Sequence, residues 1–135
     1  MGYYNLNWFL LGVIVKQALS PSQRLKSIGY AVEGIVALIK TQPNAQLHCL
    51  AIVIVVTVGW LTKVTSSEWL ALVVVIGMVL SFEALNSALE VLCDKVETDD
   101  DPQIKMVKDI AAGGVLLASI TAAVVGGLVF FPYWF

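Results

Sequence analysis

Three long stretches of the chain are apolar enough to cross a membrane. They lie at about 47–64, 69–93 and 110–131, close to or above the length of about 20 residues that a spanning helix needs. Inside lipid, every backbone N–H and C=O group must find its partner within the protein. These stretches are therefore predicted to be transmembrane helices, in spite of their many valine and isoleucine residues.

A fourth helix, of a different kind, is predicted over residues 21–41. Ser20 can cap it with Pro21 at its first position, and the segment "TQPN" ends it. Its apolar residues recur at helical spacing while its charged residues take other faces, which is typical of an amphipathic helix lying on a membrane. Residues 1–20 hold an apolar run of about ten residues, too short to span, and are expected at the membrane surface.

Composition supports this interpretation. The chain of 135 residues is 59% hydrophobic and only 13% charged, whereas soluble domains average about 25% charged residues. A net charge of -2 gives no overall attraction to nucleic acid. Cys49 and Cys93 form no CxxC pair, and the histidine, His48, merely precedes Cys49. Both cysteines are interpreted as small apolar packing residues, with a disulfide as the alternative.

The lysine and arginine residues predict the orientation. Seven of the eight precede the first span or lie between the second and third, and Lys63 alone lies between the first and second. The positive-inside rule therefore predicts a cytoplasmic N-terminus and an outer C-terminus. The amphipathic helix and the loop after the second span are then both cytoplasmic.

A polar stripe runs along the end of the second span. Glu83, Asn86, Glu90 and Asp94 fall within an arc of about 80° when each residue turns the helix by about 100°. A charged carboxylate at the centre of a membrane helix costs about 2.5 to 3.5 kcal/mol. The stripe could join helices through Asn86 and Ser87, with protonated glutamates. Carboxylates are unnecessary for that purpose, so a functional site is the favoured interpretation.

The third span begins with a counterpart to this stripe. Lys108 and Asp109 precede "AAGG" (111–114), whose small side chains allow another helix to approach closely. Carboxylates and a lysine at one membrane face can hold a divalent metal and a polyphosphate. Lys108 could instead be an interfacial anchor. The sequence has no Walker A loop, protein-kinase catalytic loop or HExxH motif, which excludes the common soluble kinase classes.

The segments that carry these residues resemble a known family. "EALNSALEVLCDKV" and "KDIAAGGVLL", together with "RLKSIGYAVEGI" and "TQPNAQLH", are similar to the prokaryotic integral-membrane diacylglycerol kinases and undecaprenol kinases over about residues 24–130. The resemblance implies an all-α homotrimer whose subunits have an amphipathic helix and three transmembrane helices, with a kinase domain over 21–135. It also implies Mg²⁺- and ATP-dependent phosphorylation of a lipid alcohol, at active sites shared between subunits, on the cytoplasmic face of the bacterial inner membrane.

The resemblance further implies roles for individual residues. Glu83 takes the position of the catalytic base, with Asn86 beside it, and Glu90 that of a glutamate binding metal and nucleotide. Residues matched to nucleotide contacts are Tyr30, Lys108 and Asp109.

One departure concerns the metal. Where many members carry a second metal-binding glutamate, this chain has Gln42, so weaker Mg²⁺ binding is expected unless the acidic cluster at 99–101 compensates. Gln42 and the aromatic N-terminus motivate an alternative function, a non-catalytic trimeric scaffold or partner subunit derived from the family. A proton or ion pathway is a third hypothesis. It is weakened because no ionisable residue lies between Glu68 and Glu83.

Overall fold

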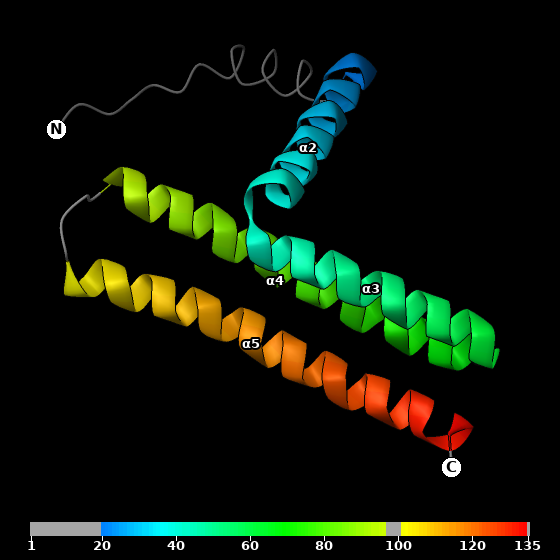
Figure 1. The fold of residues 1–135 in the computed structure, drawn as a ribbon. Helices are drawn as coiled ribbons and strands as arrows, with labels where there is room; N and C mark the ends of the chain where they lie inside the picture. The colour runs from blue at the N-terminus through cyan, green and yellow to red at the C-terminus, as the bar shows by residue number, and fades with distance from the viewer. Residues whose placement is uncertain (1–19, 97–100, 135) are drawn as a thin grey trace, which may run out of the picture. The chain divides into compact units, whose positions relative to one another are not determined.

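The structure, a computed structural model, describes residues 20–96 and 101–134, and these are almost entirely helical (Figure 1). No strand occurs in those two ranges. The prediction of an all-α fold with three helices long and apolar enough to cross a membrane is confirmed. The elements are α2 (Pro21–Thr41), α3 (Pro43–Thr62), α4 (Ser66–Val96), α5 (Pro102–Phe130) and the 3-10 helix η1 (Phe131–Tyr133).

The chain divides into two compact units, Met1–Ala37 and Leu38–Phe135. The first contains most of α2, which begins as the sequence indicates: Ser20 Oγ accepts a hydrogen bond from the backbone N–H of Gln23 at 3.3 Å. This bond satisfies one of the free donors at the helix N-terminus. That this helix lies on a membrane surface stays a prediction.

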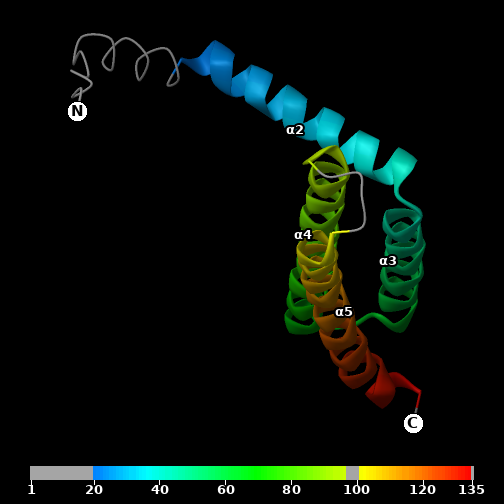
Figure 2. The same ribbon diagram turned by 90° about the vertical axis from the view of Figure 1, so that its left-hand side faces the viewer.

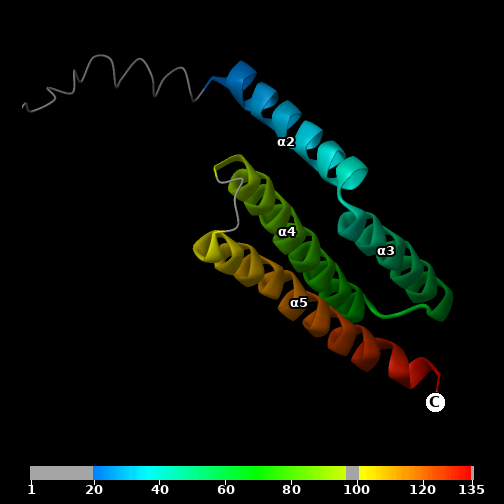
Figure 3. The same ribbon diagram turned by 60° about the vertical axis from the view of Figure 1, so that its left-hand side comes forward.

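In the second unit, α4 lies next to both α3 and α5 (Figures 2 and 3). Helix α5 runs antiparallel to α4 and makes far more contact with it than α3 does. Residues of all three helices line one cavity, which contains the candidate site.

The turn between α3 and α4 is tight. Lys63 adopts the left-handed conformation (φ 57°, ψ 45°), and the following N–H of Val64 donates to the carbonyl of Gly59 at 3.2 Å. Thr65 and Glu68 then cap α4 reciprocally: the backbone N–H of Thr65 donates to Glu68 Oε2 at 2.7 Å, and the N–H of Glu68 donates to Thr65 Oγ1 at 3.4 Å. The capping fixes the direction in which α4 starts.

Contacts at this same end hold the three helices together. Val64, Leu72 and Val129 form a buried apolar cluster, and Tyr133 Oη donates a hydrogen bond to Glu68 Oε2 at 2.7 Å. Trp69 lies against Gly59 so closely that an added Cβ would be 2.9 Å from the indole ring. The helices are thus fixed at the end far from the polar stripe.

At the opposite end, α4 and α5 extend beyond the predicted spans. Helix α4 continues to Val96, and α5 begins at Pro102 rather than near residue 110. Asp101 explains the early start, because its side chain accepts hydrogen bonds from the backbone N–H groups of Gln103 (2.7 Å) and Ile104 (3.0 Å). Both the end of the polar stripe and Lys108 therefore lie on regular helix.

Candidate functional site

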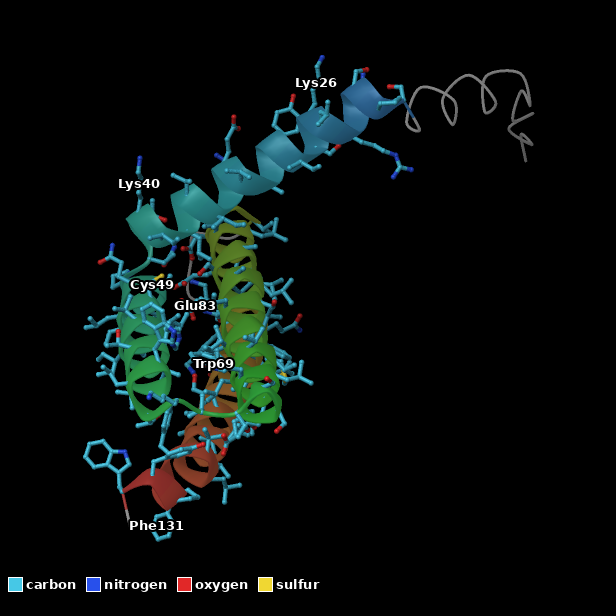
Figure 4. All side chains as sticks on the ribbon, turned by 90° about the vertical axis from the view of Figure 1, so that its right-hand side faces the viewer. Lys26, Lys40, Cys49, Trp69, Glu83 and Phe131 are labelled. Atoms are coloured by element: carbon cyan, nitrogen blue, oxygen red, sulfur yellow. The ribbon has the colours of Figure 1, made fainter. Side chains whose placement is uncertain are left out.

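Glu83 is the most deeply buried charged residue in the described part of the chain, with 1% of its surface exposed. It lies on α4 on the face that also buries Val75, Val79 and Ser87, at steps of four residues. Figure 4 shows Glu83 between α3 and α4. The sequence pattern predicted a polar face here, and the packing directs its deepest carboxylate into the protein.

One oxygen of this carboxylate is left without a partner. Glu83 Oε2 is buried and accepts no hydrogen bond within the described residues. An ionisable side chain close to it is His48 on α3, whose Nε2 lies 3.8 Å from Glu83 Oε2. Buried polar atoms are nearly always hydrogen-bonded. Glu83 Oε2 is therefore an acceptor available for an incoming donor.

A cavity of about 430 Å³ is lined in part by Glu83. All three long helices of the second unit contribute to it, and small residues of α5 leave the space open. It is lined by Asn44, Leu47, His48 and Ala51 of α3, Glu83 and Asn86 of α4, and Ala112, Val115, Leu116 and Ser119 of α5.

A second cavity of about 280 Å³ shares His48, Ala51 and Ser119 with the first. Its other lining residues are all apolar: Ile52, Val55, Ile76, Val79, Ala122 and Ala123. The polar pocket around Glu83 is therefore next to an apolar one. Together they can accept a molecule that has a polar group at one end and an apolar chain at the other.

Asn86 lies where two pockets meet. It is half-buried and lines both the Glu83 cavity and a third cavity, of about 660 Å³, between α4 and α5. The third cavity is otherwise apolar, with Phe82 packed against Gly114 at its wall. The amide of Asn86 can donate or accept a hydrogen bond on either side.

The remaining predicted residues lie toward the other end of the stripe. Glu90 is exposed, and Asp94 forms an ion pair with Lys108 of α5. Asp109 pairs with Lys105 one turn before it. The structure therefore separates the stripe into a buried carboxylate at Glu83 and an exposed charged region near Lys108.

Gln42 and Tyr30 are the two remaining predicted site residues. Gln42 is the N-cap residue of α3, and its side chain makes no capping hydrogen bond within the described residues. Tyr30 lies on α2 in the unit that ends at Ala37. Its nucleotide contact stays a prediction.

In the ranges 20–96 and 101–134, no three His, Cys, Asp or Glu side chains are close enough to hold a metal ion. Asp101 caps α5, and residues 99 and 100 of the acidic cluster lie outside the described residues. A single carboxylate at Glu90 still suits Mg²⁺, which usually binds through one or two carboxylates together with substrate phosphates.

His48 is the site residue that sequence reasoning missed. The sequence interpretation treated it only as the neighbour of Cys49. An ionisable side chain inside an apolar span is itself a signal of function. Applied to the 47–64 stretch, that rule would have selected His48.

Comparison with known proteins adds independent information. Residues 29–130 match the family model described as prokaryotic diacylglycerol kinase. The chain is 34% identical to an undecaprenol kinase of Bacillus subtilis over 107 residues, which is 79% of this chain and 87% of the relative. It is 35% identical to a diacylglycerol kinase of Synechocystis over 109 residues, 80% of this chain and 62% of the relative. A diacylglycerol kinase of Haemophilus influenzae is 24% identical over 108 residues, covering 92% of that protein.

Proposed function

Because the chain belongs to the prokaryotic diacylglycerol kinase family and is a lipid kinase, we propose that it transfers the γ-phosphate of ATP to the hydroxyl group of a membrane lipid alcohol. The acceptor is diacylglycerol or undecaprenol, because its relatives are named as kinases of these two lipids. The reaction requires Mg²⁺ and takes place at the cytoplasmic face of the bacterial inner membrane.

The observation that supports the proposal most strongly is the unpartnered Oε2 of Glu83 in its cavity. A lipid hydroxyl entering the cavity can donate its hydrogen bond to this oxygen. As the hydroxyl oxygen attacks the γ-phosphorus, Glu83 takes the proton, and the bond from the γ-phosphorus to the bridging oxygen of ADP breaks. General-base catalysis of this kind contributes about 10²- to 10⁴-fold in rate.

Asn86 lies one turn after Glu83 and lines the same cavity. Its amide can hydrogen-bond the hydroxyl oxygen or a phosphate oxygen, and so orient the two reacting groups. Holding reactants in line is a large part of phosphoryl-transfer catalysis, because little covalent chemistry is left to the protein.

The exposed charged region is the proposed nucleotide end of the site. Glu90 lies about 10 Å along the helix from Glu83 at 1.5 Å per residue. Lys108 carries the ammonium group for the phosphates, and Asp109 and Tyr30 complete the proposed nucleotide contacts. Mg²⁺ bound with the nucleotide, held by Glu90 and Gln42, would neutralise part of the triphosphate charge. ATP then approaches from water while the lipid hydroxyl arrives from the membrane.

We further propose that three copies of the chain assemble and share their active sites. In the most apolar 18-residue stretch of α3, only 11% is buried. The same fraction holds for the helical segment Pro102–Tyr133, which contains α5. Large apolar faces are thus free to contact lipid or other copies. No single chain brings together a full set of metal ligands in its described residues, and a shared site would supply the remainder.

A lipid-panel assay tests this function. Purified protein in mixed micelles is given radiolabelled ATP and Mg²⁺ with diacylglycerol, undecaprenol and related alcohols in turn. We expect Mg²⁺-dependent labelling of at least one lipid. If every lipid stays unlabelled, the proposed kinase function is wrong and the non-catalytic scaffold gains support.

A further inference from the structure

His48 is the single histidine of the chain, and it lies at the junction of two cavities. Its side chain is 22% exposed, and it lines both the polar pocket around Glu83 and the apolar pocket beside it. An imidazole half-buried among apolar groups normally needs a hydrogen-bond partner. In the described part of the chain, Glu83 is the acidic residue that lies within ion-pair distance of His48.

The two side chains complement each other. His48 Nε2 and Glu83 Oε2 are 3.8 Å apart, which exceeds the usual hydrogen-bond length of about 2.7 to 3.2 Å by less than an ångström. A small side-chain rotation closes this gap. Hydrogen bonds at catalytic sites are often long before substrate binds and shorten in the substrate complex.

We propose that His48 is a positioning residue of the acceptor site: its Nε2–H donates a hydrogen bond to Glu83 Oε2 and fixes the orientation of that carboxylate. The proposal rests on the proposed function, in which Glu83 is the base. His48 belongs neither to the sequence motif around Glu83 nor to the charged end of the stripe, so no role had been assigned to it.

The hydrogen-bonding capacity of Oε2 allows both donors. A carboxylate oxygen has two lone pairs, so Glu83 Oε2 can accept one bond from the imidazole and one from the lipid hydroxyl. During transfer the hydroxyl proton goes to Glu83, while the Nε2–H of His48 keeps its hydrogen bond to that carboxylate. His48 therefore gains and loses no proton, and its contribution is orientation alone.

The location of His48 also relates it to the lipid. Ala51, one turn later on α3, and Ser119 on α5 line both cavities along with it. A chain lying in the apolar cavity would bring its hydroxyl past the imidazole to reach Glu83. His48 thus lies at the point where the apolar part of a substrate meets its reacting group.

Three substitutions separate positioning from packing. His48→Leu removes the donor, His48→Gln retains an N–H near the place of Nε2, and His48→Asn places its amide nearer to Nδ1. We expect kcat to fall about 10- to 100-fold in His48→Leu, since misplacement by about 1 Å has effects of that size. The KM for ATP should stay unchanged, His48→Gln should recover most of kcat, and His48→Asn should not.

Gln46→Leu is the matched control. It removes a polar side chain from the same turn of α3, but Gln46 donates to the carbonyl of Ile39 and does not line the Glu83 cavity. Wild-type kcat is expected for this variant. The inference is overturned if His48→Leu keeps wild-type kcat, or if His48→Asn restores turnover as well as His48→Gln does.

A second measurement needs no activity. Because the chain has one histidine, its ring ¹⁵N signals are unambiguous in a labelled protein in detergent micelles. We expect the Nε2 signal to move in Glu83→Leu and to stay in place in Glu90→Leu. An Nε2 signal insensitive to Glu83 overturns the inference. An inactive wild-type protein contradicts the proposed function instead, and the ¹⁵N result still decides whether the two side chains are in contact.

Discussion

Asp94 and Lys108 form an ion pair that joins the end of α4 to the second turn of α5. The two residues are 14 positions apart, on either side of the loop between the helices. Lys108 is the residue proposed to contact phosphate, and Asp94 is the last member of the polar stripe. The position of the lysine is therefore set in part by the stripe itself.

Asp94→Asn is expected to weaken nucleotide binding moderately. Exposed ion pairs contribute little, so the KM for ATP should rise by at most about fivefold, with kcat little changed. Steady-state kinetics with varied ATP measures this change. In a Lys108→Met background, Asp94→Asn should have no further effect on KM, because the two residues then act through one interaction. Additive effects would contradict this account.

Gln42→Glu should lower the Mg²⁺ concentration that the enzyme needs for activity. The substitution adds a carboxylate at the position where related kinases are expected to have one, and hard cations prefer charged oxygen ligands. We expect half-maximal activity at a lower Mg²⁺ concentration, measured by titration at fixed ATP. Gln46→Glu is the control, since it adds the same charge where the side chain contacts the carbonyl of Ile39. Equal responses of both variants would show a general effect of charge.

Gly59→Ala should destabilise the packing of α3 on α4. A Cβ at this position meets the ring of Trp69 at 2.9 Å, and overpacking of this kind costs about 1 to 3 kcal/mol. The expected result is a lower midpoint in thermal unfolding in detergent. Gly77→Ala is the control, because its added Cβ meets nothing within 4 Å and alanine favours helix. A Gly59→Ala midpoint equal to that of the wild type would contradict the close packing.

Much of the fold was predictable because its determinants are local. Backbone hydrogen-bond satisfaction in lipid makes each apolar stretch helical whatever lies beside it. Helical periodicity alone placed Glu83, Asn86 and Glu90 on one side of α4. The start of α2 at Pro21 likewise follows from neighbouring residues.

The site depends on tertiary packing, which the sequence does not express directly. His48 and Glu83 are on different helices, and their proximity follows from the way the turn at Lys63 returns the chain beside α3. Periodicity placed Glu83 and Asp94 on one face without distinguishing the buried carboxylate from the one paired with Lys108. The start of α5 at Pro102 follows from the cap that Asp101 provides, whereas the sequence alone offers Asp101 as part of an acidic cluster.

The central claim is that Glu83 is the base that accepts the proton of the lipid hydroxyl. Glu83→Gln keeps the size and one oxygen of the side chain but removes its basicity. We expect kcat to fall about 10²- to 10⁴-fold, while the KM for ATP and the thermal midpoint stay close to those of the wild type. A wild-type kcat in Glu83→Gln, measured with the lipid that the panel identifies, would contradict the account.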